Sequence, residues 1–166
     1  SHQNFADMRY GLDPRFRFTV SRAIYKGMLQ FLANQYKQDY VVQPLPVDHM
    51  SARFTKDTEV ELTWQPVDDP LEPTAKAEQY IVYTRIGEGD FDNGILVNKN
   101  SYRTNIPSGV ICSYKVTAVN KGGESFPSEI LSVGKAIQTK GTVLVINGFD
   151  RIGAPADFVA PQDSIA

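Results

Sequence analysis

The spacing of apolar residues changes along this chain from a helical period to a strand period. Between residues 14 and 36, apolar side chains recur every three or four positions, which predicts an amphipathic helix. Asp13 is placed to cap this helix and Pro14 to begin it. Residues 4–10 predict a short preceding helix that Gly11 ends. The expected apolar stripe, which another surface must cover, consists of Phe16, Val20, Ile24, Met28, Phe31 and Leu32.

From residue 59 onward, apolar and polar residues alternate with period two, which predicts strands that bury one face. The inward positions are Val60, Leu62 and Trp64, then Tyr80, Val82 and Thr84, then Cys112, Tyr114, Val116 and Ala118. Turn signals separate these runs at 68–70, 92–94, 107–109 and 121–123. Since no helical pattern intervenes, the strands are expected to form antiparallel sheets packed face to face.

Two further segments differ from this pattern. Residues 38–47 contain Gln43-Pro44-Leu45-Pro46, which favours an extended linker. Residues 142–147 are apolar on both faces, which is typical of a central strand in a parallel sheet. We therefore expect residues 138–166 to begin a separate α/β domain, with a partly disordered end from residue 154.

Charge is unevenly distributed along the chain. Residues 1–40 have a balance of +3, residues 41–134 a balance of −5, and the rest is neutral, so that the net charge is −2. An acidic sandwich segment argues against a nucleic-acid partner. No apolar run reaches the length of about 20 residues that a membrane span requires. The single cysteine, Cys112, excludes an internal disulfide.

The candidate metal and nucleophile residues favour structural interpretations. His2 and His49 are far apart in sequence, so no metal site and no cofactor are expected. Asp90 to Gly94 resembles half of a calcium loop, but positions 95–101 lack the closing carboxylate. Asn93-Gly94 instead predicts a tight hairpin turn. Cys112 shares the inward parity of Tyr114 and is expected to be a core residue rather than a nucleophile.

Aromatic residues and carboxylates were the remaining candidates for chemistry. Trp64 is expected in the core, whereas the candidates for stacking on a ligand are Tyr83, Phe91, Tyr102 and Phe126. Glu59 and Glu61 are expected to project into water from one strand, and Asp68-Asp69 lie in a loop. A glycosidase pair must flank a cleft, and this pattern builds none. We expect no catalytic residue in this chain.

The middle of the chain resembles the fibronectin type III family. Its second strand is matched by Val60-x-Leu62-x-Trp64 and its third by residues 79–83. The strongest match is residues 114–120, followed by Gly122-Gly123-Glu124-Ser125 and Pro127-Ser128. The resemblance implies an immunoglobulin-like, mainly β antiparallel sandwich, here with an N-terminal amphipathic helix. It also implies a tyrosine corner at Tyr114. The implied core consists of Trp64, Tyr80, Tyr114, Val116 and Ala118.

The first residues resemble the end of bacterial zinc-dependent N-acetylmuramoyl-L-alanine amidases. The matching runs are residues 1–4 and Arg22-Ala23-Ile24-Tyr25-Lys26-Gly27-Met28. In that family the zinc ligands and the catalytic Glu precede the matched positions, so a non-catalytic remnant is implied. The implied order of an amidase-like domain, a fibronectin module and an α/β domain is similar to large exported bacterial proteins, some of the xanthan lyase kind.

These observations predict four segments: a helical remnant at 1–37, a linker at 38–47, a fibronectin type III domain at 48–137, and the start of an α/β domain at 138–166. The expected function is that of a non-catalytic spacer in a protein acting on cell wall or polysaccharide. The alternative is a module that recognises glycan or protein. The expected partners are neighbouring domains of the same polypeptide and a glycan. The resemblances imply a secreted, periplasmic or cell-surface location.

Overall fold

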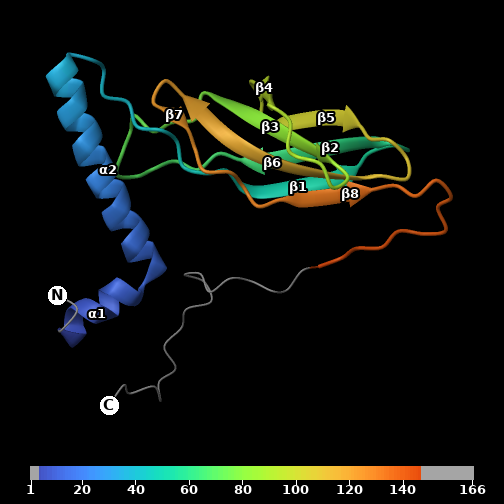
Figure 1. Ribbon diagram of the computed structural model, residues 1–166, viewed down its shortest axis with the longest axis horizontal. Coiled ribbons are helices and arrows are strands. Elements are labelled where there is room, and N and C mark those ends of the chain that lie inside the picture. The colour runs from blue at the N-terminus through green and yellow to red at the C-terminus, as the bar shows by residue number, and fades with distance from the viewer. Residues whose placement is uncertain (1–3, 147–166) are drawn as a thin grey trace. The chain divides into compact units, whose positions relative to one another are not determined.

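The computed structural model describes residues 4–146 of the chain. They belong to two compact units, and each is described by itself. A helical unit contains the described residues up to Gln38 together with residues 143–146. A sandwich unit, Asp39–Thr142, contains every strand that the structure describes. Figure 1 labels the helices and strands of both units.

The helical unit consists of α1 (Phe5–Leu12) and α2 (Pro14–Tyr36). Asp13 caps α2, since its Oδ1 accepts a hydrogen bond from the Arg15 N–H at 2.8 Å, and this bond lowers the pKa of Asp13. The helix predicted over 14–36 is confirmed. The prediction that Gly11 ends the first helix is wrong, because α1 continues to Leu12. A glycine inside a helix costs only about 1 kcal/mol relative to alanine.

The apolar stripe of α2 remains exposed to solvent. Phe16, Val20, Ile24, Met28, Phe31 and Leu32 are between 40% and 66% exposed. We expected another surface to cover this stripe, and within the described part of the helical unit none covers it fully. Its spacing is therefore sufficient to predict the helix, but it does not specify a partner.

The sandwich unit has two antiparallel sheets, whose strands are labelled in Figure 1. The first sheet has the order β1-β2-β5, and the second β4-β3-β6-β7, with β8 paired to β6. The strands are β1 (Asp48–Phe54), β2 (Glu59–Gln65), β3 (Gln79–Ile86), β4 (Ile95–Val97), β5 (Ser101–Asn105), β6 (Ile111–Asn120), β7 (Gly123–Glu124) and β8 (Leu131–Gly134). The expected antiparallel β-sandwich is thus present.

The core lies between the two sheets and uses the inward positions of the alternating pattern. Val60 and Leu62 of β2 are fully buried, and Trp64 is 2% exposed. The Trp64 ring meets the ring of Tyr80 edge-on, with 5.3 Å between centroids. From β6, the side chains of Cys112, Tyr114, Val116 and Ala118 complete the same core. Burial raises the pKa of the Tyr114 phenol, and the nearby Cys112 side chain adds to this shift.

The connection between β3 and β4 differs from the prediction. The chain turns at Ile86–Gly89, where the Gly89 N–H donates to the Ile86 carbonyl oxygen at 3.4 Å. Asn93 and Gly94 come later, just before β4, and Gly94 has a φ of 77°. The expected tight turn at Asn93-Gly94 is therefore wrong. The Asp92 N–H donates to the Thr84 carbonyl oxygen at 2.9 Å. The pairing with β3 therefore continues on the N-terminal side of β4, toward the turn at Ile86–Gly89.

The apolar segment predicted as a strand over 142–147 is not a strand in its described part, residues 142–146. Val143, Leu144, Val145 and Ile146 are between 80% and 85% exposed. A strand needs a neighbour to pair its backbone N–H and C=O groups, and apolar side chains alone do not supply one. Asn147 and most of the predicted α/β domain lie outside the described residues.

Candidate functional site

The segment that enters the sandwich, residues 39–47, is packed against it, and we name it the entry segment. Val42 is fully buried, Pro44 is less than 2% exposed and Val47 is 7% exposed. The backbone has no strand, as the prolines predicted. The segment was predicted as part of a linker over 38–47. A free linker would leave these side chains in water, whereas here they contribute to the compact sandwich unit.

Asn120, at the end of β6, connects the entry segment to the sandwich. Its Nδ2 donates to the carbonyl oxygens of Val42 at 2.9 Å, Thr74 at 3.1 Å and Lys76 at 3.2 Å. Its Oδ1 accepts a hydrogen bond from the Gly122 N–H at 2.7 Å. Asn120 is 8% exposed, so these bonds satisfy polar groups that water reaches poorly. One buried amide thus holds three separate chain segments together.

A second set of polar contacts holds the same segment from the other side. The Val42 N–H donates to Thr74 Oγ1 at 3.1 Å, and Thr74 Oγ1 donates to Glu72 Oε1 at 2.7 Å. The Tyr40 hydroxyl donates to Glu72 Oε2 at 2.8 Å. Glu72 is only 6% exposed. Its buried carboxylate therefore accepts hydrogen bonds at both oxygens, as a buried charge requires.

Gly122 allows the close approach of the entry segment. A Cβ placed on Gly122 would overlap the carbonyl oxygen of Val41, which is backbone and cannot swing away. Any other residue at this position would therefore displace either the β6–β7 turn or the entry segment. We call the contacts of Asn120, Thr74, Glu72 and Gly122 with residues 40–42 the entry contacts.

The outward face of the second sheet carries a different group of side chains. Lys115 of β6 places its Nζ 4.5 Å from the ring centroid of Phe91 and 5.0 Å from that of Tyr83. The Arg85 guanidinium carbon lies 5.1 Å from the centroid of Phe91. Both cations are thus within the range of cation–π attraction. We name Tyr83, Arg85, Phe91 and Lys115 the aromatic–cationic patch.

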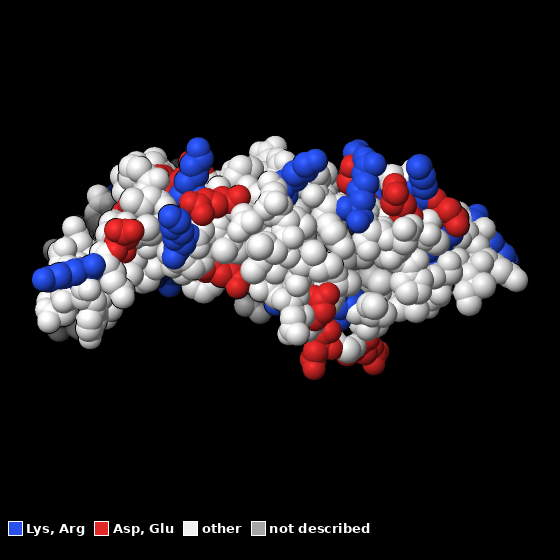
Figure 2. All heavy atoms as spheres, turned by 90° about the horizontal axis from the view of Figure 1, so that it is seen from above, with Lys and Arg blue, Asp and Glu red and all other residues white. Residues whose placement is uncertain are grey.

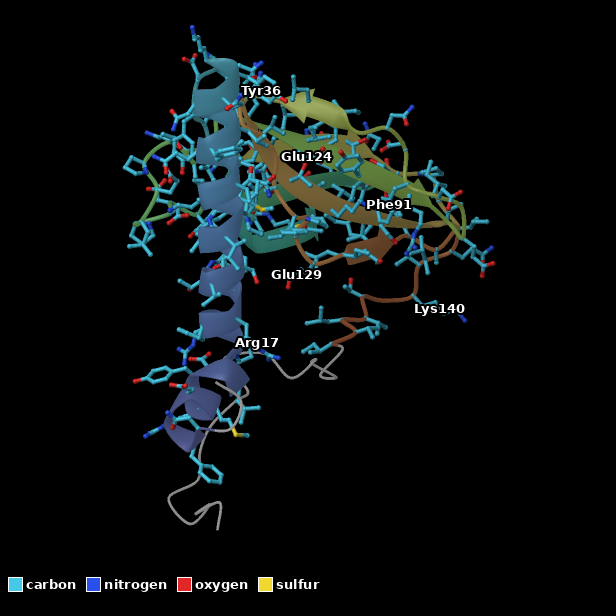
Figure 3. The ribbon with its side chains drawn as sticks, turned by 60° about the vertical axis from the view of Figure 1, so that its left-hand side comes forward. Arg17, Tyr36, Phe91, Glu124, Glu129 and Lys140 are labelled. Atoms are coloured by element: carbon cyan, nitrogen blue, oxygen red, sulfur yellow. The ribbon has the colours of Figure 1, made fainter. Side chains whose placement is uncertain are left out.

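Glu124 of β7 closes one side of this patch (Figure 3). Its Oε1 accepts hydrogen bonds from the Tyr83 hydroxyl at 2.6 Å and from Thr117 Oγ1 at 2.7 Å. The bond to Glu124, together with burial, raises the pKa of Tyr83 to about 12. The phenol of Tyr83 therefore stays protonated at neutral pH, and its ring is held in a fixed position on the sheet.

The structure brings two of the four predicted stacking residues together. Tyr83 and Phe91 share Lys115. Tyr102 lies on β5 in the other sheet and packs against the core. Phe126 follows β7 and is 67% exposed. Arg85 and Lys115 were missed as site residues. Arg85 shares the outward face of β3 with Tyr83, and Lys115 shares that of β6 with Thr117, and this alternation could be read from the sequence. The register that pairs the two strands could not.

Cys112, considered as a nucleophile, and Trp64, considered for stacking on a ligand, are both buried. Cys112 is 1% exposed, and burial raises the pKa of its thiol, which disfavours the reactive thiolate. Trp64 lies in the core and offers no ring face to a ligand. His49 is exposed and pairs with neighbouring Asp48, with 3.2 Å from Nδ1 to Oδ2. His2 lies outside the described residues.

The carboxylates are used in local structure. The prediction that Glu61 projects into water is wrong, since its two oxygens accept hydrogen bonds from Arg53 at 2.6 Å and Arg103 at 2.7 Å. These partners flank β2 on both sides and lower the pKa of Glu61. Asp92 Oδ1 accepts the backbone N–H groups of Thr84 in β3 and of Gly94 in its own loop. Asp69 Oδ1 accepts the N–H of Leu71 at 2.9 Å.

Three further observations concern metal binding, membrane spans and surface charge in the described residues. Among the described residues, no group of three or more His, Cys, Asp or Glu side chains is placed to hold a metal ion. Neither α1 nor α2 combines the length and the apolar character needed to cross a membrane. In Figure 2, basic and acidic side chains are mixed along the upper part of the face in view, and a mainly acidic group lies at its lower edge.

Comparisons with known proteins inform the fold. No protein-family model matches the chain, and no curated protein matches it. The structure of the C. elegans twitchin kinase region, which includes a domain named Fn31, is 20% identical over 57% of this chain, with a TM-score of 0.50. The chain covers only 17% of that structure.

Two single domains are also similar. A fourth FNIII domain of human origin is 20% identical over 61% of this chain and 85% of its own, with a TM-score of 0.49. The FN5 domain of Drosophila Lar is 17% identical over 56% of this chain and 97% of its own, with a TM-score of 0.42. The sheet order, the buried Trp64 and the twitchin likeness agree on one architecture. The sandwich unit of this chain is a fibronectin type III-like domain.

Proposed function

We propose that this chain is a non-catalytic spacer module that sets the direction in which a preceding domain joins the sandwich. Domains of this fold commonly serve as accessory or spacer modules. The observation that carries the proposal is the entry segment, whose Val42 is fully buried and bonded through both its N–H and its carbonyl oxygen. A spacer controls geometry only if the chain is held at the point where it enters, and here it is held.

The entry contacts reduce the conformational freedom of the chain at the point where it enters the sandwich. Nine free residues would behave as a coil with a root-mean-square span of about 15–18 Å. Burial of Val42 and Pro44 and the bonds of Asn120 replace that freedom with one path along the sandwich. Ordering such a segment costs about 1–2 kcal/mol per residue in backbone entropy. The buried contacts offset that cost, which supports a role in positioning.

The proposed parent is a secreted bacterial multidomain protein that acts on cell wall or polysaccharide. Support comes from the resemblance of residues 1–28 to the end of zinc-dependent amidases and from the domain order that it implies. The proposal assigns catalysis to other domains of that parent. This chain, incubated with purified peptidoglycan, is then expected to release no soluble muropeptide, and release by the pure chain would contradict the assignment.

A glycine substitution tests the spacer role directly. Gly122→Ala should force residues 40–42 away from the sandwich while the core stays folded, because the added Cβ meets only entry-segment backbone. NMR relaxation and amide exchange of residues 39–47 are the measurements. We expect rigid, protected amides in the wild type and mobile, exchanging amides in the variant.

Gly141→Ala is the matched control, since nothing lies within 4 Å of a Cβ at that position. It should leave the entry segment unchanged. If residues 39–47 of the wild type already move like a free chain on the nanosecond scale, the spacer proposal fails, whatever the variant does.

Recognition is the second candidate function, and the aromatic–cationic patch favours it. Tyr83 and Phe91 lie on one sheet face beside two cations, and none of these four side chains belongs to the core between the sheets. Exposed polar and aromatic groups gathered on a rigid sheet are a common basis for ligand binding.

A further inference from the structure

The two cations of the aromatic–cationic patch lack the partners that charged side chains usually have. Within residues 4–146, neither Arg85 nor Lys115 forms an ion pair with a carboxylate; their close neighbours are aromatic rings. The other arginines of the sandwich, Arg53 and Arg103, both bind Glu61. The patch therefore has two positive charges with capacity for an anion.

Arg85 also has an unused hydrogen-bond donor. Its Nε is buried and has no hydrogen-bond partner among the described residues. Its Nη2 donates to Ser113 Oγ at 3.3 Å, and that hydroxyl lies 2.9 Å from the hydroxyl of Ser132. A buried donor without an acceptor is unfavourable by about 1–3 kcal/mol. Arg85 thus has a donor that the described residues leave unused.

The position of the patch on a sheet face restricts the kind of ligand. Backbone groups of β3 and β6 are already used in strand pairing, in which Tyr83 lies opposite Lys115 and Arg85 opposite Ser113. A peptide that adds a strand needs a free sheet edge. A ligand on this face meets rings, hydroxyls and two cations, with the Glu124 carboxylate at one side engaged by Tyr83 and Thr117. Rings, hydroxyls and cations are groups that recognise a saccharide carrying carboxylates.

We propose that Arg85 and Lys115, held against Phe91, form a carboxylate-binding subsite for an acidic polysaccharide of the uronic-acid class. Arg85 would bind a carboxylate oxygen through its guanidinium, and Lys115 would supply the second charge. Ser132 is exposed beside this position, and its hydroxyl lies 2.9 Å from that of the buried Ser113, to which Arg85 donates, so Ser132 is the hydroxyl that can meet a sugar. The inference rests on the recognition alternative of the proposed function and names its substrate class.

The surrounding charge makes the proposal selective. Residues 41–134 have a balance of −5, and the adjacent loop carries Glu88, Asp90 and Asp92. A polyanion is therefore not drawn to the domain by its overall field. Binding must depend on the local pair of cations, and removal of one cation should have a large effect. The affinity should also fall as salt increases.

The test uses the full chain and oligogalacturonate as the probe, followed by NMR amide shifts. The expected result is saturable shifts confined to β3, β6 and residues 90–92. Lys115→Gln and Arg85→Gln should each weaken binding about tenfold, while Lys99→Gln, an exposed lysine outside the patch, should leave it unchanged. A neutral maltooligosaccharide of equal length should bind at least tenfold more weakly.

Several outcomes would overturn the subsite. These are absence of shifts at millimolar probe, equal loss of binding in the Lys99→Gln variant, and equal or tighter binding of poly-glutamate, which would indicate an acidic peptide instead. Unchanged spectra outside the patch confirm that each variant is folded. Entry-segment rigidity is recorded in the same samples, so failure of the subsite with a rigid entry segment leaves the spacer role standing.

Discussion

Helix α2 and strand β6 both follow an amphipathic pattern, yet the apolar face of β6 is buried and that of α2 is exposed. The inward residues of β6 are at most 1% exposed, whereas Ile24 and Met28 of α2 are 60% and 62% exposed. The β6 face meets a second sheet of its own unit, whereas no other described element of the helical unit covers the α2 stripe fully. Periodicity therefore predicts the element, and burial depends on what the rest of the chain provides.

The largest expected effect tests this contrast in stability. Trp64→Ala should destabilise the sandwich by about 3–5 kcal/mol, because it removes a large buried side chain and leaves a cavity. Ile24→Ala on α2 should change the free energy of unfolding by less than about 0.5 kcal/mol, since that side chain is already in water. Urea denaturation measures both. Similar losses for the two variants would show that the α2 stripe is buried in solution.

The next effect concerns the buried polar contacts of the entry segment. Asn120→Ala should cost about 1–3 kcal/mol, because three carbonyl oxygens and the Gly122 N–H lose their partner. Asn98→Ala, an exposed amide bonded only to Gln79, should cost much less. The measurement is again urea unfolding, with amide exchange at Val42. An unchanged Val42 exchange rate in Asn120→Ala would contradict the assigned role of this amide.

A smaller effect should appear in acid. Arg53 and Arg103 lower the pKa of Glu61 from its usual 4.5, so its contribution to stability is complete above pH 4.5 and is lost as pH falls through the lowered value. In the Glu61→Gln variant, the free energy of unfolding should decrease less steeply as pH falls through this range. Glu78→Gln, at an exposed position, is the control. Parallel acid-unfolding curves for wild type and Glu61→Gln would contradict the expectation.

The smallest effect concerns the patch and should appear in alkali. The pKa of Tyr83 is raised to about 12, chiefly by its bond to Glu124, so its contribution to stability is present below pH 10 and is lost as pH rises through 12. Glu124→Gln should lower the pKa of Tyr83 toward 10, whereas Glu129→Gln should not change it. NMR titration of the tyrosine ring signals measures this. An unchanged Tyr83 titration in Glu124→Gln would exclude the bond.

Much of the fold could be predicted, because the relevant forces are local. Alternation placed Trp64 and Tyr114 on inward positions, and Asp13-Pro14 marked the start of α2. The candidate sites could be predicted only in part. Tyr83 and Phe91 were identified as exposed aromatics, but their association with Lys115 depends on the pairing of β3 with β6. Asn120 contacts Val42, 78 residues away in sequence, and no local pattern signals that contact.

By itself, the sequence determined the helix over 14–36 and the alternating strands that contain Trp64, Tyr80 and Tyr114, because the periods of 3.6 and 2 and the capping residues act within a few positions. Tertiary structure alone decided which faces are buried and which cationic side chains have no carboxylate partner. It also decided that residues 39–47 pack on the sandwich. It also decided that Glu61, outward by parity, is enclosed by Arg53 and Arg103. These outcomes depend on contacts between distant segments, whose register and close approach only the folded chain specifies.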